Sequence, residues 1–329
     1  MTAPVAGRST RVIARICAAA LAACCCANAA SQAYPNRPVR FIVPHAAGGA
    51  NDIIARVIAP QLGENLGQQV VVDNRAGGSA IIGTTALARS PADGYTIMLA
   101  DVPHAANPAL NSKLPYDTLK DFIAIVQVAQ MPSLLIVHPA FPVNSVEELV
   151  RLARAKPGQI NYASAGAGSS IYLTMQLFIS RTGIDLFHVP YKSGAPALAD
   201  VIGGQVPMEF VTTAAGISPV RAGRVRALGV TSAKRIAALP DTPTIAEQGL
   251  PGFEDYFWQG VIAPAGVPAE IVAKLNAEIN RALASRVVQE RISGLGADIV
   301  GGTPERLQDF IRAQVESWSR IIKPGARVD

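Results

Sequence analysis

Beyond its N-terminal segment the chain contains no cysteine. All four of its cysteines, Cys17, Cys24, Cys25 and Cys26, lie within that segment. If the segment is removed on export, the remaining chain forms no disulfide and offers neither a thiolate nucleophile nor a cysteine metal site. Its stability must then come from an apolar core, which a chain of this size can supply.

Charged residues are also scarce. They make up 16% of the 329 residues, against about 25% in an average soluble domain. This composition excludes a disordered chain, which combines high charge with low hydropathy. Mean hydropathy is high at +0.27, yet beyond the N-terminus no run of ~18 apolar residues forms a membrane span. Short segments rich in Ala, Val and Ile, separated by 28 Gly and 24 Pro, are typical of an α/β protein, and the length indicates about two domains.

The N-terminal segment has the pattern of a secretory signal peptide. Arg8, Arg11 and Arg15 precede the apolar run Ile16–Ala27, and mostly small residues follow. We therefore predict that residues 1–33 are a signal peptide, cleaved on export to the periplasm.

A bacterial lipobox is the competing interpretation of this segment. Leu21-Ala22-Ala23-Cys24 has the required form and would leave Cys24 lipidated. Either processing step removes three arginines, which lowers Lys+Arg from 29 to 26 against 24 acidic residues. The resulting net charge, 26 − 24 = +2, gives no reason to expect a nucleic-acid partner.

The mature sequence alternates strand and helix patterns. Val39–Val43 is a buried-strand run, after which Asn51 or Asp52 is expected to cap a helix that stops at Gly67. The same alternation continues and predicts parallel-dominated sheets covered by helices. The further strands are expected at Val70–Val72, Gly94–Leu99, Leu134–Val137, Ile160–Ala163, Leu186–Val189, Val206–Val211 and Val225–Thr231. The further helices are expected at Ser145–Lys156, Tyr172–Thr182, Pro268–Ala284 and Thr303–Ile321.

A catalytic constellation is missing. The four histidines, His45, His104, His138 and His188, are isolated from one another and lack the close spacing of a zinc site. The chain has no nucleophile elbow, no P-loop lysine and no complete dinucleotide fingerprint after a strand. We therefore predict no catalytic residue, no metal site and no cofactor.

A recurring unit takes the place of a catalytic motif: a strand, a loop of small residues, and then a helix. It occurs at Pro44–Asp52, at Asn74–Ala80 and at Ala163–Ser170. Such loops expose backbone N–H groups at helix N-termini, where anions bind. Each loop alone has the plainer interpretation of a tight connection. Three of them in an exported chain favour ligand capture over catalysis.

An ordered set of short motifs runs along nearly the whole mature chain. Its members are Ile42-Val43-Pro44, Ala47-Gly48-Gly49, Asp52, Ala55-Arg56, Gly67-Gln68, Val72–Arg75, Pro91–Thr96, Leu114–Asp117, Asn161–Ser164, His188–Lys192, Gly203–Val206 and Ala263–Gly266. Taken together, these motifs resemble the periplasmic substrate-binding proteins of tripartite tricarboxylate transporters, the Bug (TctC-like) family.

The resemblance implies an α/β fold of the two-lobed periplasmic binding protein class, type II, with a hinge between the lobes. Lobe 1 would comprise residues 34–134 and 256–329, and lobe 2 residues 135–255, with crossings near Pro132 and Trp258. It also implies a monomer that binds a small carboxylate between its lobes and delivers it to membrane permease subunits. Neither a nucleic-acid partner nor a cofactor follows from it.

Carried over position by position, the resemblance places the ligand on the three loops. Gly48 and Gly168 would allow close approach to the backbone, and serine hydroxyls would add hydrogen-bond donors. The alternative for Ser169 and Ser170 is that they only cap the helix that follows. The predicted ligand-binding residues are His45, Ala47, Gly48, Asn51, Ser79, Ala80, Gly168, Ser169 and Ser170.

Three positions depart from the family pattern and affect the choice of ligand rather than the fold. His45 stands where the family usually has Phe, Tyr172 where it commonly has His, and Val211 where it commonly has Asp. His45 is either a contact to an anionic ligand or an exposed or core histidine. Tyr172 is either a core or rim aromatic or a ligand contact.

The expected function is that of a periplasmic solute-binding protein that captures a carboxylate for a tripartite tricarboxylate-type transporter. Two alternatives stay open. One is a secreted serine hydrolase using Ser169 or Ser79, although no base lies near either serine in the sequence. The other is a sensory module that presents its ligand to the ectodomain of a membrane sensor. Dicarboxylates, tricarboxylates, amino acids and aromatic carboxylates all fit as ligands.

Overall fold

The computed structural model describes residues 34–322. The predicted signal peptide, the lipobox and all four cysteines lie outside the described residues. Residues 38–322 belong to one compact unit. Within it the strands are hydrogen-bonded in the order β2-β1-β3-β9-β4-β7-β5-β6, with β8 and β10 paired to β4.

The first group of strands is parallel, as predicted. β1 lies between β2 and β3 and runs parallel to both. Four of the five β1 side chains are fully buried, which explains why this run forms a central strand. Helix α2 connects β1 to β2 and ends at Gly67, whose φ of +67° gives the left-handed turn expected of a glycine stop. The elements are β1 Val39–Val43, α2 Ala50–Leu66, β2 Val70–Asn74, α3 Ile81–Ala88, β3 Thr96–Asp101 and α4 Val102–Leu110.

Two long uncharged strands connect the two halves of the fold. β4 (Phe122–Val137) pairs with β9 (Tyr256–Pro264) as far as Pro132, and from Ser133 onward it pairs with β7 and β8. The expectation of parallel-dominated sheets is wrong for this middle region, where every pairing is antiparallel. The chain leaves the first strand group along β4 and returns along β9, so the two neighbours run in opposite directions.

The second group of strands is again parallel, with β5 between β6 and β7. Its apolar core includes Leu134, Ile136, Ala163, Val211 and Val230. A serine cap starts α5 as predicted, because the Ser145 hydroxyl accepts a hydrogen bond from the backbone N–H of Glu148. The elements are α5 Val146–Ala155, β5 Asn161–Ser164, α6 Ser170–Thr182, β6 Phe187–Pro190, α7 Gly194–Ile202, β7 Met208–Thr212, α8 Thr213–Arg221, β8 Arg226–Val230 and the 3-10 turn Ala246–Gln248.

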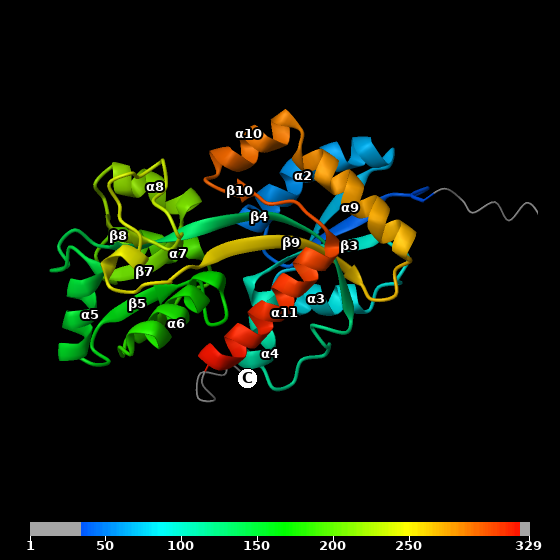
Figure 1. The fold of residues 1–329 in the computed structure, drawn as a ribbon. Coiled ribbons are helices and arrows are strands. Elements are labelled where there is room, and N and C mark those ends of the chain that lie inside the picture. Colours follow the sequence, from blue (N-terminus) through cyan, green and yellow to red (C-terminus); the bar gives the residue numbers. More distant parts are fainter. Residues whose placement is uncertain (1–33, 323–329) are drawn as a thin grey trace, which may run out of the picture. The chain divides into compact units, whose positions relative to one another are not determined.

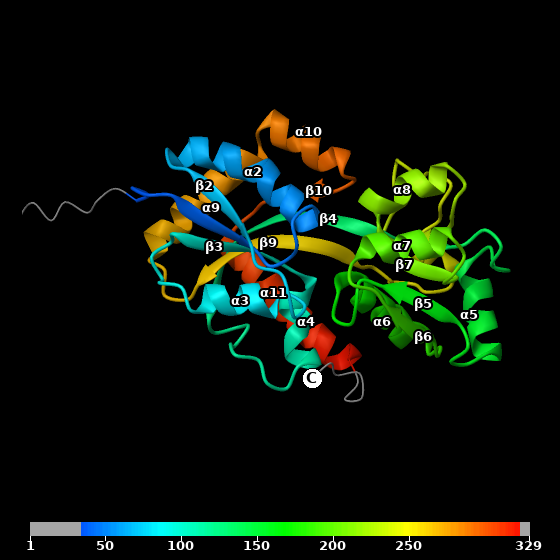
Figure 2. The ribbon, with the colours of Figure 1, turned by 180° about the vertical axis from the view of Figure 1, so that it is seen from behind.

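The C-terminal segment packs back against the first strand group. Asn276 on α9 donates a hydrogen bond to the carbonyl oxygen of Ile125 in β4. Figures 1 and 2 show α2, α9 and α10 on one side of β4 and β9, and α3, α4 and α11 on the other. The predicted helices α9 (Ala269–Leu283) and α11 (Pro304–Ile321) are confirmed, whereas α10 (Arg286–Gly294) and β10 (Asp298–Ile299) were not expected.

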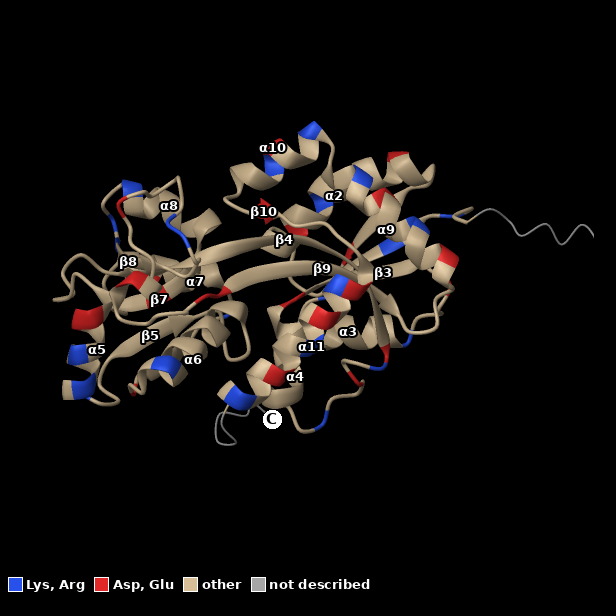
Figure 3. Cartoon of the chain, viewed as in Figure 1, with Lys and Arg blue, Asp and Glu red and all other residues tan. Residues whose placement is uncertain are grey.

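Acidic and basic residues share the same surface helices. Figure 3 shows both signs on α5, α9, α10 and α11, which agrees with the small net charge of the mature sequence. Along residues 34–322, no helix combines the length and the apolarity needed to cross a membrane.

Candidate functional site

The first of the three small-residue loops follows β1 and leads into α2. Helix α2 starts at Ala50 with Gly49 as its N-cap, so the prediction that Asn51 or Asp52 caps the helix is wrong. The Asp52 carboxylate instead accepts a hydrogen bond of 2.8 Å from the backbone N–H of Gly48. Gly48 has a φ of +82°, which L side chains rarely adopt. The turn therefore depends on a glycine and on a carboxylate one helical turn further along.

A polar network holds this loop in place. Asp52 accepts hydrogen bonds of 2.9 Å from Arg56 Nε and from Asn74 Nδ2, and Asn74 also donates to the carbonyl oxygen of His45. Burial would raise the pKa of Asp52, but the hydrogen bonds from Arg56, Gly48 and Asn74 and the charge of Arg56 outweigh it and lower that pKa. The network thus holds the loop in place while residues 46–49 stay exposed.

His45 and Asn51 converge on a buried carboxylate. His45 Nε2 lies 2.8 Å from Asp101 Oδ2, and Asn51 Nδ2 donates to the same oxygen at 2.9 Å. Asp101 is the last residue of β3 and is fully buried. Burial would lower the pKa of His45, but the negative charge of Asp101 beside the ring raises it. Two predicted site residues therefore share one acidic partner.

The second loop precedes α3 and has an unusual backbone. Ser79 and Ala80 have φ values of +48° and +74°, a region that costs a non-glycine residue about 1–2 kcal/mol. Asn107 Nδ2 supports the turn by donating to the Ser79 carbonyl oxygen at 2.9 Å. The Ser79 hydroxyl donates at 2.9 Å to the carbonyl oxygen of Ala167 in the third loop. This strained turn brings the second and third loops together.

The third loop precedes α6, and Ser169 is the N-cap of this helix. Its Oγ accepts a hydrogen bond from the Tyr172 backbone N–H at 3.4 Å and donates to the Gly166 carbonyl oxygen at 2.7 Å. Ser170 is the first residue of the helix. Gly168 has a φ of +78°, and a Cβ added there would lie 2.7 Å from Ser79 Oγ. Glycine is therefore required at this contact for both conformation and space.

The three loops lie side by side although they are far apart in the sequence. Asn74 links the first loop to the strand before the second, and Gly83 of α3 packs closely on Pro44. Ser79 joins the second loop to the third through Ala167. All nine predicted site residues belong to this arrangement. It presents the starts of α2, α3 and α6, where backbone N–H groups without helical partners favour negative charge.

A serine–histidine pair supports the third loop and was missed by sequence reasoning. Ser164 Oγ lies 2.6 Å from His188 Nε2 and accepts a hydrogen bond from the Gly166 backbone N–H. The His188 ring stacks on Tyr162 at 5.0 Å and packs on Tyr172 at 4.8 Å. The pairing follows from the register of β5 on β6, which no local sequence signal predicts.

The structure also shows the surroundings of two departures from the family pattern. Tyr172 is buried at 7% exposure and packs on His188, so it is a core aromatic. Val211 belongs to the apolar cluster beneath α7 and α8.

The serines named for a hydrolase are engaged as structural donors. Ser79 and Ser169 each donate their hydroxyl hydrogen to a backbone carbonyl. The serine that does contact a histidine, Ser164, is completely buried.

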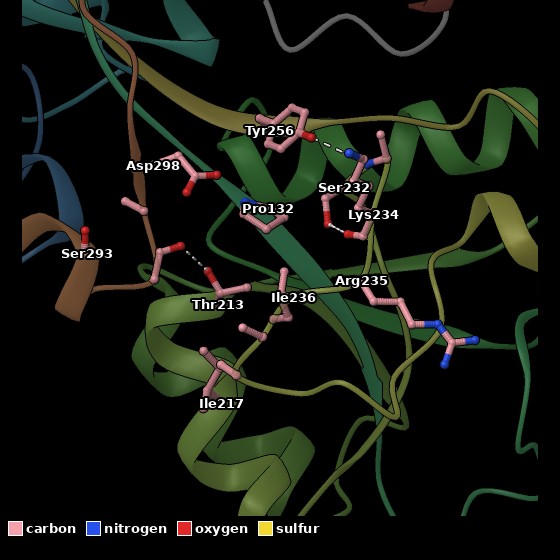
Figure 4. Close-up of a pocket in the computed structure, with 15 residues that line it drawn as sticks. Pro132, Thr213, Ile217, Ser232, Lys234, Arg235, Ile236, Tyr256, Ser293 and Asp298 are labelled. Atoms are coloured by element: carbon pink, nitrogen blue, oxygen red, sulfur yellow. Dashed lines mark hydrogen bonds between the residues drawn. The ribbon is translucent and has the colours of Figure 1, made fainter.

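A separate hollow lies at the crossing of the two long strands. It has a volume of about 570 Å³ and is lined by Pro132 and Tyr256, by Thr213 and Ile217 of α8, and by residues around Asp298. Figure 4 shows that Thr213 and Ile217 line one side and that Tyr256 and Asp298 lie above them. None of the predicted site residues lines this hollow.

Comparison with known proteins places the chain in a family. The sequence pattern of the "Tripartite tricarboxylate transporter family receptor" matches residues 54–326. The chain belongs to this receptor family. A protein from the tcbD–tcbE intergenic region of Pseudomonas sp. (strain P51) is 42% identical over 292 residues, covering 88% of this chain and 87% of that protein.

Solved structures agree with this assignment. The periplasmic binding protein BugD is 37% identical with a TM-score of 0.78, covering 88% of this chain and 97% of BugD. An R. palustris protein solved with adipate is 38% identical with a TM-score of 0.79, covering 88% and 97%. MatC from Rhodopseudomonas palustris, solved with malate, is 32% identical with a TM-score of 0.80, covering 88% and 100%.

These findings confirm the predicted fold class and the main functional interpretation. The chain has the two-lobed, type II periplasmic binding protein fold, and it is a solute-binding protein of the tripartite tricarboxylate transporter family rather than an enzyme. The serine hydrolase alternative is not supported.

Proposed function

We propose that this receptor captures a small carboxylate on its three loops and delivers it to the permease subunits of a tripartite transporter. The observation that carries the proposal is the meeting of the three loops through Asn74 and Ser79. Residues 46–49 of the first loop and 75–78 of the second are exposed. All three loops lead into helix starts, where a carboxylate replaces its hydration with N–H donors. Relatives solved with adipate and malate support a ligand of this class.

The nine predicted residues have different roles in this proposal. Backbone groups of Ala47, Gly48 and Gly168 face the ligand, because they lie at turns where a side chain is absent or small. Ser79 and Ser169 shape the loops through their own hydrogen bonds. His45 and Asn51 contact the buried carboxylate of Asp101. Ala80 and Ser170 stand at the starts of α3 and α6.

Ligand capture in this proposal involves movement of two lobes. They comprise residues 34–134 with 256–329, and residues 135–255. The change of partner along β4 supports this division, since β4 pairs with β9 up to Pro132 and with β7 from Ser133. Thr231 links both crossings: its hydroxyl accepts a hydrogen bond from the Ser133 N–H and donates to the Asp255 carbonyl oxygen.

The family and the N-terminal pattern support the proposed cellular setting. We place the mature protein in the periplasm as a monomer, with cleavage after Ala33. Lipidation at Cys24 is the alternative form of the same export. Delivery to permease subunits is preferred over presentation to a sensor ectodomain because the matching family is a transporter receptor.

A thermal-shift screen of carboxylates tests the proposal. The library contains aliphatic di- and tricarboxylates, amino acids and aromatic acids, with the matching amides and alcohols as controls. A ligand at 100 times its Kd stabilises the folded state by ~2.7 kcal/mol. We expect stabilisation by carboxylates and none by the controls. No shift with any carboxylate, or equal shifts with the amides, would contradict the proposal.

A further inference from the structure

His45 occupies a position from which it can report on the charge of a ligand. It follows β1 directly and begins the first loop. Its side chain is 31% exposed, whereas that of its partner Asp101 is 1% exposed. A carboxylate buried to this extent requires compensation by a cation or by hydrogen-bond donors. His45 is therefore held by Asp101 and still reaches solvent.

None of the other groups named here near Asp101 is a cation that could pair with it in place of His45. From α2, Asn51 is uncharged and Asp52 is engaged by Arg56. From α4, burial lowers the pKa of His104 to about 4, so this imidazole is neutral. From β9, Gln259 lies opposite Asp101 and is uncharged.

Several buried polar atoms of Asp101 and of residues next to it lack a hydrogen-bond partner. Asp101 Oδ1, Asn51 Oδ1 and both amide atoms of Gln259 are buried and have no hydrogen-bond partner among residues 34–322. Buried polar atoms without a partner are uncommon in folded proteins. These atoms belong to the end of β3, the start of α2 and β9, and Asn51 follows the loop that carries Gly48.

The two ring nitrogens of His45 have different surroundings. Nε2 faces Asp101, and Nδ1 is neither buried nor hydrogen-bonded within the described part of the chain. A protonated imidazole donates from both nitrogens. The ion pair with Asp101 favours this protonated form, and Nδ1–H is then available to an acceptor on a ligand.

We propose that His45 determines specificity by donating from Nδ1 to a second acidic group of the ligand, so that a dicarboxylate binds together with a proton. Asp101 is the positioning residue that holds the ring. The inference rests on the proposed carboxylate-binding function and adds a requirement to it. A monocarboxylate of equal length lacks the second acceptor and binds without proton uptake.

Calorimetry with a matched ligand pair tests the inference. Adipate and hexanoate are the first pair, and the tightest dicarboxylate from the screen with its monocarboxylate analogue replaces them if adipate does not bind. Titrations in buffers of different ionisation enthalpy measure proton uptake directly. We expect dicarboxylate affinity to fall about tenfold between about pH 6 and about pH 8.5, while the monocarboxylate changes little.

Three variants assign the effect to His45. His45→Gln abolishes proton uptake and lowers dicarboxylate affinity about tenfold at the lower pH. Asp101→Asn moves the pH dependence to lower pH, because it removes the charge that favours the imidazolium. His138→Gln, in which a part-exposed histidine beyond the end of β4 is replaced, is the control and leaves both properties unchanged. If Asp101→Asn does not fold, the His45→Gln titration decides.

The possible failures are distinct. A dicarboxylate that binds with pH-independent affinity, or proton uptake retained in His45→Gln, overturns this inference and leaves the proposed function standing. Binding of hexanoate as tight as that of adipate also overturns it. Failure of every carboxylate in the screen overturns both the inference and the proposed function.

Discussion

The hydroxyl of Ser79 donates a hydrogen bond of 2.9 Å to the carbonyl oxygen of Ala167, 88 residues further along the chain. The bond joins the loop before α3 to the loop before α6. Under the lobe division proposed above, it connects one lobe to the other at the loops proposed to bind the ligand. It therefore stabilises the arrangement in which all three loops can contact one ligand.

The first prediction concerns this contact. Ser79→Ala removes a hydrogen bond worth ~0.5–1.5 kcal/mol, so ligand affinity should fall roughly three- to tenfold. Gly168→Ala should cost more affinity, because its Cβ would lie 2.7 Å from Ser79 Oγ. Gly183→Ala is the matched control, since Gly183 also has a positive φ but its Cβ would meet no atom within 4 Å. Equal calorimetric affinities for the two glycine variants would contradict the role of the contact.

The second prediction separates capping from ligand binding at Ser169. Ser169→Ala should destabilise the protein by ~1 kcal/mol through loss of the helix cap. It should also weaken ligand binding about tenfold, because the loop loses the hydrogen bond from the Ser169 hydroxyl to the Gly166 carbonyl oxygen. Ser145→Ala loses a comparable cap on α5, away from the loops, and should lower stability alone. Urea unfolding and calorimetry are run on both variants. If Ser145→Ala weakens binding as much, the loss at Ser169 reflects general destabilisation.

The third prediction concerns pH and the buried carboxyl of Glu209. Glu209 lies beside Ile136 and Ala163 in the apolar core, and burial raises its pKa from 4.5 to about 9. The folded state retains a proton that the unfolded state releases above its lower pKa, so this group reduces stability as pH rises through that interval.

Glu209→Gln removes that penalty. The variant should be more stable than the parent at about pH 8, and the difference should shrink towards about pH 5. Denaturant unfolding at the two pH values measures it. A difference of the same size at both pH values would show that Glu209 does not titrate as described.

The fourth prediction uses the two tryptophans to follow domain motion. Trp258 lies in β9 opposite Gln130, two residues from the crossing at Tyr256, and packs edge-on against Phe310 at 5.4 Å. Trp318 is buried in α11. Ligand should alter the tryptophan fluorescence, and Trp258→Phe should remove most of the change while Trp318→Phe retains it. Identical responses of the two variants would count against a hinge near Tyr256.

Local signals predicted much of the fold. The apolar run Val39–Val43, the glycine stop at Gly67 and the serine cap at Ser145 each depend on a few neighbouring residues, and each is found as expected. The antiparallel pairing of β4 with β9 was not predicted, because it joins segments more than a hundred residues apart whose apolar runs fit either direction.

In the candidate site, too, features that depend on neighbouring residues were predicted and long-range contacts were not. The small-residue loops are visible in the sequence because glycine and serine after a strand indicate a turn that leads into a helix. The pairs that shape them, His45 with Asp101 and Ser164 with His188, were present in the sequence only as isolated residues. Strand register brings them together, and register is a property of the whole sheet.

The most direct test of the account is the affinity of Gly48→Val for the carboxylate found in the screen. Gly67→Val is the matched control, because both glycines have a positive φ and a Cβ at either would meet no atom within 4 Å. Circular dichroism confirms that each variant is folded, and calorimetry gives its Kd. If the first-loop backbone binds the carboxylate, Gly48→Val loses more than tenfold in affinity and Gly67→Val binds as the parent does. Full-strength binding by a folded Gly48→Val protein would contradict the loop account.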